Sequence, residues 1–399
     1  MSNPSSSKSI AAVGAPVPML DLKRQYVSIR PEVEEAIARV CESQQLILGD
    51  EAVAFEREAS SFLGVAETIA CGSGTDALWL MMQAAGIGAG DSVITTPFSF
   101  FASASAIVRT GARPVFVDID PATLNLDPVK VEEKLQDAGF RVKGILPVHL
   151  YGQCARMDRF ADIAAEHKLM LFEDAAQAFG ATWRGKRAGN LGLAAAFSFY
   201  PTKNLSAFGD AGCVTTNDTP TAARVRSLRN HGSTRRYYHD EIGWNARMDA
   251  IQAAVLRIKL KRLPEWNAKR RELAANYDKL LVDSGLTGPR GTGGKLDSRH
   301  PMQIPATLAE NVHIFHQYVI RADRRDELRK FLSDRAIGSE IYYPAPLHLQ
   351  RPFTYLGYLE GDLPEAERAA KEVLALPMFP ELTEEEQKRV VGAIAEFYS

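Results

Sequence analysis

Residues 195–212 read AAFSFYPTKNLSAFGDAG, in which two apolar runs flank a short loop that carries Lys203. The runs predict buried strands over Ala195–Tyr200 and Gly212–Thr215. A lysine just past a buried strand is kept partly out of water. That environment lowers the pKa of a lysine from about 10.4 toward ~7–8 and makes its amine a nucleophile for carbonyl groups.

A second segment, FEDAAQAFG (residues 172–180), follows another predicted strand. Asp174 stands at the end of that strand, and Gln177 lies one helical turn later on the same side. A carboxylate accepts a hydrogen bond from a pyridinium N–H, and an amide donates one to a phenolic oxygen, so the pair matches opposite parts of the pyridoxal phosphate ring. Alone, Asp174 is better explained as a helix cap. Together with Gln177 and Lys203 it predicts a pyridoxal phosphate site for amine transfer.

Small and hydroxyl residues near these segments are candidates for binding the cofactor's phosphate. The turn GSGT (residues 72–75) lies between a predicted strand and a predicted helix, where Gly74 and Thr75 can offer backbone N–H groups to an anion. Ser198, five residues before Lys203, can add a hydroxyl. Each has a structural alternative, because the glycines also suit a plain turn and a strand serine also bonds to its neighbouring strand.

An aromatic residue and the start of a long helix are further candidates. Phe100 can stack on the ring, although core packing is the commoner fate of a phenylalanine, and Phe98 and Phe101 compete for the role. In GWNARMDAIQAA, Asn245 can bind phosphate and Arg247 can bind a carboxylate with its planar fork. Helix capping by Asn245 and a solvated Arg247 are the alternatives.

Two histidines and one basic loop are candidates for substrate binding. His316 and His348 lie in polar and aromatic contexts where a sugar can hydrogen-bond, yet each is also explained as a structural histidine. Tyr237 and His239 follow two arginines and can contact a diphosphate, although a solvated loop explains the charges nearly as well. The eight histidines form no HxxxH or HExxH pair, so we predict no metal site.

Short apolar runs alternate with helical patterns from about residue 65 to 216, which predicts an α/β fold with a mostly parallel sheet between helices. The seven predicted strands are Thr68–Cys71, Ser92–Thr96, Pro114–Val117, Gly144–His149, Leu169–Phe172, Ala195–Tyr200 and Gly212–Thr215. The pattern in the C-terminal third of the chain predicts a smaller α+β domain. Its expected elements are a loop over 285–312, strands over Ile314–Ile320 and Ser339–Tyr343, a helix over Arg324–Arg335 between them, and a last helix with a Thr383–Glu386 capping box.

These patterns predict a disordered tail over residues 1–18, a large cofactor-binding domain over 19–265 and a small domain over 266–399. We expect an N-terminal helix beginning near Pro31 to pack with the small domain. With a net charge of −2, nothing favours a nucleic-acid partner, and no apolar run is long enough for a membrane helix. The four scattered cysteines fit free thiols, so we expect a cytoplasmic protein.

Eight segments also occur in the order that one known family shows. They are CGSGTDAL, GARPVFVDIDPATLNLD, PVHLYGQ, FEDAAQAFGA, FSFYPTKNL, GDAG, RNHG and GWNARMDAIQAAVLRIKL. They resemble the sugar aminotransferases of the DegT/DnrJ/EryC/StrS family, and the resemblance covers nearly everything after residue 18. It implies the fold type I, aspartate aminotransferase-like architecture of pyridoxal phosphate enzymes.

The resemblance also implies roles for individual residues. Lys203 would link covalently to the cofactor, Asp174 would contact the pyridine nitrogen and Gln177 the phenolic oxygen, while Phe100 would take the ring-stacking position. Phosphate ligands would be Gly74, Thr75, Ser198 and, from the other subunit of a homodimer with shared active sites, Asn245. The family's substrates are nucleotide-linked keto-deoxysugars, with glutamate as the usual amine donor.

The resemblance leaves the exact reaction open. Dehydratases of the same family replace the lysine with histidine, so Lys203 favours transamination. The stretch FGDAG favours amination of a 3-keto-6-deoxyhexose, although Ala211 departs from the frequent GDGG, and 4-keto enzymes more often carry GEGG. A non-catalytic cofactor or sugar sensor is the alternative from another class. An oxidoreductase is disfavoured, because the glycines of GIGAGD follow a helix and precede a strand, the reverse of a dinucleotide-binding order.

Overall fold

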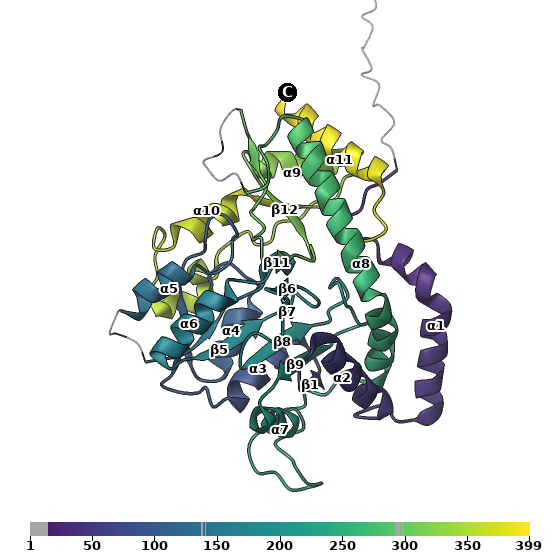
Figure 1. Cartoon of the computed structure of the whole chain (residues 1–399), viewed down its shortest axis with the longest axis vertical. Coiled ribbons are helices and arrows are strands. Elements are labelled where there is room, and N and C mark those ends of the chain that lie inside the picture. Colours follow the sequence, from purple (N-terminus) through teal and green to yellow (C-terminus); the bar gives the residue numbers. More distant parts are fainter. Residues whose placement is uncertain (1–14, 137–138, 140, 292–295, 297–298) are drawn as a thin grey trace, which may run out of the picture.

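The computed structural model describes residues 15–136, 139, 141–291, 296 and 299–399. Its centre is a seven-stranded sheet with the order β1-β9-β8-β5-β4-β2-β3 (Figure 1). Neighbouring strands run parallel except at β9, which is antiparallel to β1 and β8. The strands are β1 (Glu67–Cys71), β2 (Ser92–Thr95), β3 (Arg113–Phe116), β4 (Val142–Leu146), β5 (Met170–Asp174), β8 (Ala194–Ser198) and β9 (Gly212–Thr216). Each of the seven predicted strands corresponds to one of them, so the predicted sheet is confirmed.

Helices cover both faces of this sheet. Apolar residues of α2 (Asp50–Leu63), α5 (Pro128–Leu135), α6 (Met157–His167) and the first half of α8 (Ala250–Asp283) join one buried cluster. Apolar residues of α3 (Gly74–Ala84), α4 (Ala102–Arg109) and α7 (Thr219–Leu228) join another. A parallel sheet is stable only when both faces are buried in this way.

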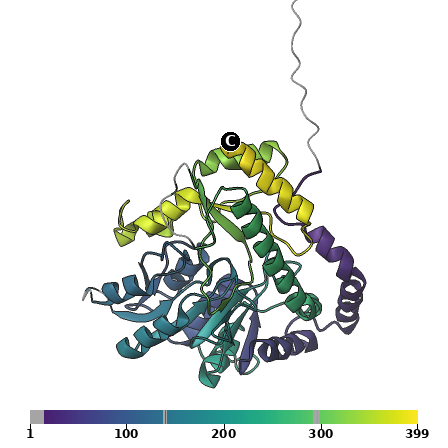
Figure 2. The ribbon, with the colours of Figure 1, turned by 45° about the horizontal axis from the view of Figure 1, so that its top comes forward.

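The C-terminal part forms a second, three-stranded antiparallel sheet with the order β10-β12-β13. Its elements are β10 (Met302–Gln303), β12 (Tyr318–Ala322), α9 (Arg325–Asp334), α10 (Pro364–Glu372), β13 (Val373–Leu376) and α11 (Glu384–Tyr398). Figure 2 shows the yellow C-terminal helix lying across the top of the molecule, above the large sheet. The capping box of Thr383 and Glu386 is present at the start of α11.

Two sequence predictions in this part are wrong. Residues 339–343 form no strand, because only Glu340 pairs with Ala375 and the tyrosines that follow bond to residues near the large sheet. The strand beside β12 is instead β13. The predicted loop 285–312 also contains β10 and β11 (Asn311–Val312), and β11 forms a small sheet with β6 (Thr182–Trp183) and β7 (Lys186–Arg187).

The N-terminal helix α1 (Leu22–Ser43) begins nine residues before Pro31, because Asp21 caps it by accepting hydrogen bonds from two backbone N–H groups. Most of its apolar face packs on the first half of α8. It contacts the C-terminal part through its first turn, where Arg24 lies 2.7 Å from Glu386. The packing predicted for this helix is therefore correct only at its first turn.

The predicted tail ends earlier than residue 18, since Val17 is buried and forms a bridge with Ile337. Residues 1–14 of that tail lie outside the described residues. The domain boundary at residue 265 stays a prediction, because the continuous helix α8 passes through it (Figure 1). No helix among the described residues is long and apolar enough to span a membrane.

Candidate active site

The predicted cofactor residues meet at the carboxyl ends of β5 and β8. These strands are parallel neighbours, with Asp174 paired to Ala196, so the two chains leave the sheet at the same edge. Ligands of α/β sheets bind at this edge, because the loops that follow the strands line it. Asp174 is the last residue of β5, and Ser198 is the last residue of β8.

Asp174 is a buried carboxylate that is 3% exposed. Its Oδ2 accepts a hydrogen bond from Ser103 of α4 at 2.6 Å, and Oδ1 accepts one from the Ala176 N–H at 3.2 Å. Burial raises its pKa above the ordinary value, against the opposing effects of the Ser103 hydrogen bond and the Lys203 charge. A cationic ring N–H placed beside Asp174 would offset this burial, so the residue fits a protonated pyridine nitrogen.

Gln177 is held in one orientation by two partners. Its Oε1 accepts from the Tyr151 N–H at 2.6 Å, and its Nε2 donates to the hydroxyl of Tyr343 at 3.1 Å. Since the amide oxygen is already engaged, Nε2 is the atom that can reach a further acceptor. The side chain therefore offers a donor, as binding to a phenolic oxygen requires.

Lys203 lies in the loop between β8 and β9. Its backbone N–H donates to the Tyr200 carbonyl at 2.8 Å, and the Ala207 N–H donates to the Phe199 carbonyl at 2.7 Å, which closes the loop on itself. Burial lowers the pKa of the Lys203 amine from 10.5 to about 8, and the Asp174 charge acts in the opposite direction. An amine with this pKa has a substantial neutral, nucleophilic fraction near neutral pH.

Gly74, the first residue of α3, packs directly against the end of β8. A Cβ added there would lie 2.6 Å from Ser198 Cβ and 3.1 Å from Ser198 Oγ. The absence of a side chain therefore leaves the N-terminal N–H groups of α3 beside the Ser198 hydroxyl, with exposed Thr75 next to them. A helix N-terminus next to a hydroxyl is chemically suited to a phosphate group.

Phe100 is 59% exposed, whereas Phe98 is fully buried in the core. The Phe100 ring lies 6.3 Å from the ring of Tyr343, the residue that also accepts from Gln177. Of these two phenylalanines, only Phe100 has a face free to stack on a ligand. Phe101 instead contacts Phe353 at 5.4 Å between ring centroids.

Asn245 and Arg247 lie beside the turn that leads to Gly74. The carbonyl of Ala246 between them accepts from the Gly72 N–H at 3.0 Å. Arg247 donates to Asn245 Oδ1 at 3.1 Å and to Asn230 Oδ1 at 3.1 Å. The structure thus brings both residues near the candidate phosphate turn of their own chain, and their predicted roles stay predictions.

His316 lies close enough to Lys203 for the lysine charge to act on it. Burial, followed by the charges of Lys203 and Arg270, holds the pKa of His316 well below its usual range. The ring is therefore neutral near physiological pH. This position is compatible with its predicted role at the site.

The other substrate candidates lie in different surroundings. His348 is buried, and its Nε2 lies 3.1 Å from Glu367 of α10; its predicted role as a substrate ligand stays a prediction. Tyr237 is 80% exposed and its hydroxyl accepts from Arg236, while His239 bonds to the His231 carbonyl. Both lie on the segment that follows α7, and in this single chain the structure does not join them to Lys203.

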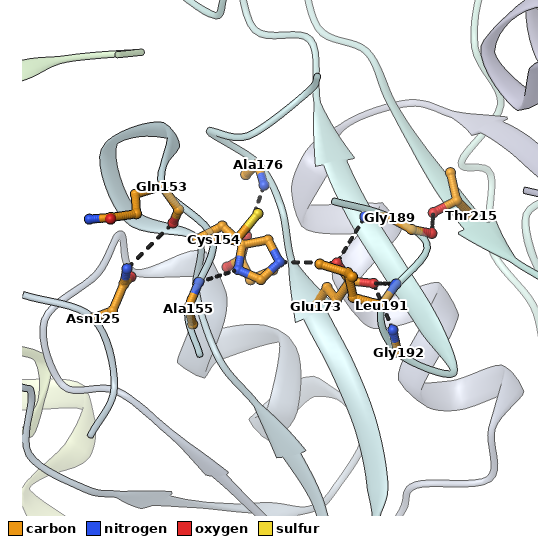
Figure 3. A network of polar contacts seen from close by, with 12 residues as sticks. Asn125, Gln153, Cys154, Ala155, Glu173, Ala176, Gly189, Leu191, Gly192 and Thr215 are labelled. Carbon is orange, nitrogen blue, oxygen red and sulfur yellow. Dashed lines mark hydrogen bonds and ion pairs between the residues drawn. The ribbon is translucent and has the colours of Figure 1, made fainter. Parts of the chain in front are cut away.

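A second buried carboxylate supports the end of β5 from its other face (Figure 3). Glu173 accepts from three backbone N–H groups in the loop 189–192, at 2.7–2.8 Å, and lies 3.0 Å from His149 Nε2. The Ala155 N–H donates to His149 Nδ1 at 3.2 Å, so the ring hydrogen is on Nε2. The backbone N–H of His149 donates to the backbone carbonyl of Asp174 at 2.9 Å, and this bond fixes the backbone that carries the Asp174 side chain.

Sequence reasoning missed Ser103, Tyr151 and Tyr343 as site residues. Ser103 stands three residues after Phe100, and Tyr151 lies in the PVHLYGQ segment, so both are close to residues or segments that the sequence analysis singled out. Tyr343 falls in a run that reads as a strand, and nothing in its local pattern indicates that it folds over Gln177.

The chain is similar to known proteins over nearly its whole length. A relative from Geobacillus stearothermophilus named "Pleiotropic regulatory protein" is 49% identical over 96% of this chain and 98% of its own. The dTDP-3-amino-3,4,6-trideoxy-alpha-D-glucose transaminase of Streptomyces venezuelae is 42% identical over 96% of both chains. The UDP-2-acetamido-2-deoxy-3-oxo-D-glucuronate aminotransferase of Pseudomonas aeruginosa is 38% identical over 95% of this chain and 99% of its own.

Solved structures share the fold as well as the sequence. The crystal structure of S. venezuelae DesV in complex with a ketimine intermediate has a TM-score of 0.89 and 42% identity, and the match covers 96% of this chain and 99% of that one. The predicted fold type I architecture is confirmed by this similarity. The DegT/DnrJ/EryC1/StrS aminotransferase family pattern matches residues 27–395, and the chain belongs to that family of enzymes.

Proposed function

We propose that this aminotransferase uses pyridoxal phosphate to move the amino group of glutamate to a nucleotide-linked keto-deoxysugar, at C3 of a 3-keto-6-deoxyhexose. One observation supports the proposal above all. A buried carboxylate, an oriented amide donor and an amine with a pKa near 8 meet at one edge of the sheet. A structural ion pair has no use for the oriented amide, whereas the ring of this cofactor needs all three groups.

The residues of the site fit the cofactor group by group. Asp174 would hold the ring nitrogen, Gln177 the phenolic oxygen, and the α3 N-terminus with Ser198 the phosphate. When bound, pyridoxal phosphate supplies a carbonyl that condenses with amines and a ring that withdraws electrons from the adjacent carbon. Lys203 Nζ would take the proton from the Cα of glutamate and return it at the cofactor's C4′, a transfer that an amine with a pKa of about 8 can make in both directions near neutral pH.

The C3 position is supported by the relatives' names. The transaminases from S. venezuelae and P. aeruginosa are named for a 3-amino and a 3-oxo nucleotide sugar. This agrees with the FGDAG segment before β9. A 4-keto nucleotide sugar is the competing substrate, and turnover of matched 3-keto and 4-keto nucleotide sugars with glutamate distinguishes them.

We also propose a homodimer with shared active sites. Exposed large apolar side chains include a run in the turn between α1 and α2 (Leu46, Ile47 and Leu48) and a pair in the segment before α8 (Ile242 and Trp244). Exposed apolar patches of this kind mark protein interfaces. The second group directly precedes Asn245, so an interface there would bring this residue near a partner's site.

A sensor without catalysis is the second candidate, favoured by the name of the G. stearothermophilus relative. A sensor needs to bind its ligand but not to turn it over. The purified protein mixed with pyridoxal phosphate and glutamate separates the two functions. An enzyme converts the cofactor to its amine form and releases 2-oxoglutarate, whereas a sensor leaves the cofactor and the glutamate unchanged.

The attachment point gives the direct test. We expect cofactor-loaded protein to absorb near roughly 400–430 nm, and after borohydride reduction the cofactor should be found on the peptide that contains Lys203. Lys203→Ala should lose the band, the modified peptide and all turnover. The control for the attachment point is Lys259→Met, because Lys259 is another buried lysine with a pKa lowered by burial to about 8, and its amine donates to Ser206 at 2.8 Å. This variant should keep the absorbance band and the cofactor on the Lys203 peptide. Full activity of Lys203→Ala would refute the proposal.

A further inference from the structure

Next to Lys203, three side chains from distant parts of the sequence form a buried chain of hydrogen bonds. They are Asn267 of α8, Asn204 directly after the lysine, and His316 before β12, and all three are buried. Asn204 Nδ2 donates to Asn267 Oδ1 at 2.8 Å, and Asn204 Oδ1 lies 3.1 Å from His316 Nδ1. This Asn267–Asn204–His316 relay is the part of the lysine's surroundings to which the proposed reaction assigns no role.

Backbone carbonyls fix the direction of every bond in the relay. Asn267 Nδ2 donates to the Phe179 carbonyl at 3.3 Å, and Asn204 Nδ2 also donates to the Ile314 carbonyl at 3.2 Å. A carbonyl oxygen only accepts, so neither amide can be turned around without losing a bond. Asn204 must therefore present its oxygen to the imidazole, which requires the ring hydrogen to be on His316 Nδ1 and leaves the lone pair on Nε2.

Two glycines leave room for the relay. A Cβ on Gly180, which has φ of +99°, would lie 2.9 Å from Asn267 Nδ2. A Cβ on Gly152, which has φ of +100°, would lie 2.9 Å from the backbone nitrogen of His316. Gly180 closes the FEDAAQAFG segment and Gly152 stands in the PVHLYGQ segment, so two separate parts of the chain leave space for the same group of side chains.

We infer that Asn267 and Asn204 are positioning residues that hold His316 as a neutral ring protonated on Nδ1, so that Nε2 remains the hydrogen-bond acceptor of a ring that bonds to the residue directly after Lys203. The inference rests on the proposed function, because the acceptor matters when the lysine amine is released from the cofactor and carries a proton. An imidazole with its hydrogen on Nε2 would present a donor to that amine and would not hold it.

The ring tautomer can be measured without cofactor. In the full-length chain labelled with ¹⁵N-histidine, the ring nitrogen shifts report which nitrogen carries the hydrogen, and His316→Gln assigns the signals. We expect Nδ1–H in the wild type and a loss of this single form in Asn267→Leu. The control Asn276→Leu removes a different asparagine of α8, which is half-buried and bonds to Gln387 at 2.8 Å, and it should leave the His316 tautomer unchanged.

A conservative variant separates positioning from packing. Asn267→Asp keeps an oxygen that accepts from Asn204, and burial favours its neutral form, whose hydroxyl can donate to the Phe179 carbonyl. It should therefore retain the Nδ1–H ring where Asn267→Leu does not. In the loaded enzyme, Asn267→Leu should lower kcat by between about 10- and 100-fold with little change in the affinity for pyridoxal phosphate.

A hydrogen on Nε2 in the wild type would overturn the inference, even if no variant folded. An unchanged ring in Asn267→Leu would overturn it as well. Failure of the protein to bind pyridoxal phosphate would refute the proposed function alone, since the tautomer is read in its absence.

Discussion

Lys203 places a cation where little water reaches it, and this has a consequence for folding. Burial lowers its pKa from 10.5 to about 8, so below pH 8 the folded protein holds a charge that the unfolded chain solvates better. The destabilisation is complete below about pH 8 and disappears as pH rises to about 10.5, where the lysine is neutral in both states. In the cofactor-free protein, the burial that gives Lys203 a reactive amine therefore also lowers the stability of the fold.

The corresponding variant is Lys203→Met, which keeps the length of the side chain without its charge. At pH 7 we expect it to raise the free energy of unfolding of the cofactor-free protein by about 1–3 kcal/mol, since one pKa unit corresponds to about 1.4 kcal/mol. Urea unfolding at pH 7 and pH 10 measures the effect, which should shrink at the higher pH. Lys269→Met, on the exposed face of α8, is the control and should change little. A variant less stable than the wild type at pH 7 would contradict the explanation.

At the same scale, the residues that sequence reasoning found and missed differ in kind. Asp174, Gln177 and Lys203 were identifiable because each stands at the end of a strand or shortly after it, and a strand end is visible as the limit of an apolar run. Ser103 and Tyr343 act on those residues from other elements, at a sequence separation of 71 residues for Ser103 and Asp174 and 166 for Tyr343 and Gln177. Contacts between distant elements depend on packing, which no local pattern encodes.

At the scale of elements, the junction of α3 and β8 decides whether phosphate can bind. Gly74→Ala adds a Cβ that would stand 2.6 Å from Ser198 Cβ and 3.1 Å from its Cα, so helix or strand must move. We expect a loss of about 1–3 kcal/mol in the free energy of unfolding and at least about tenfold weaker binding of pyridoxal phosphate.

Gly88→Ala is the matched control for this glycine. Its added Cβ would lie 3.8 Å from the nearest atom, an ordinary contact. Thermal unfolding measures the change in stability, and a fluorescence titration measures the change in affinity for pyridoxal phosphate. Equal effects of the two substitutions would show that the contact with Ser198 does not matter.

Elements of the large sheet were predictable for a physical reason. Its strands are buried on both faces, so each reads as a short apolar run between helices with explicit caps such as Asp127 and Pro128. The C-terminal part lacks this regularity. Residues 339–343 have the composition of a strand, but their tyrosines bond to Tyr151 and Gln177, and the competing run Val373–Leu376 takes the place beside β12.

At the scale of the whole molecule, α8 connects the candidate phosphate turn and the lysine loop with the C-terminal part. It begins just after Asn245 and Arg247, carries Lys259 and Asn267 to the lysine loop, and ends in the apolar cluster of the C-terminal part with Tyr277 and Leu281. A shift of this helix would move the phosphate turn and the lysine loop together. Its length was predictable from sequence only in part, because the apolar residues Met248, Ile251, Val255 and Ile258 follow a helical spacing that reaches only the beginning of the helix.

At the level of the assembly, Asn245 can serve the site of its own subunit or the site of the partner subunit. Within one chain, Ala246 accepts from the Gly72 N–H at 3.0 Å, so the Asn245 segment touches its own phosphate turn. The shared-site proposal instead requires Asn245 to reach across the interface. Asn245→Asp should abolish binding in either arrangement, because a carboxylate beside a phosphate group repels it.

Two inactive variants in one dimer distinguish the arrangements. In a heterodimer of Lys203→Ala and Asn245→Asp subunits, isolated with two different affinity tags, shared sites leave one site with both changes and one with neither. We expect about half of the wild-type activity per dimer. If Asn245 acts within its own subunit, each site carries one defect and the heterodimer is as inactive as the two parents. A monomeric protein in solution would rule out the shared site before any activity is measured.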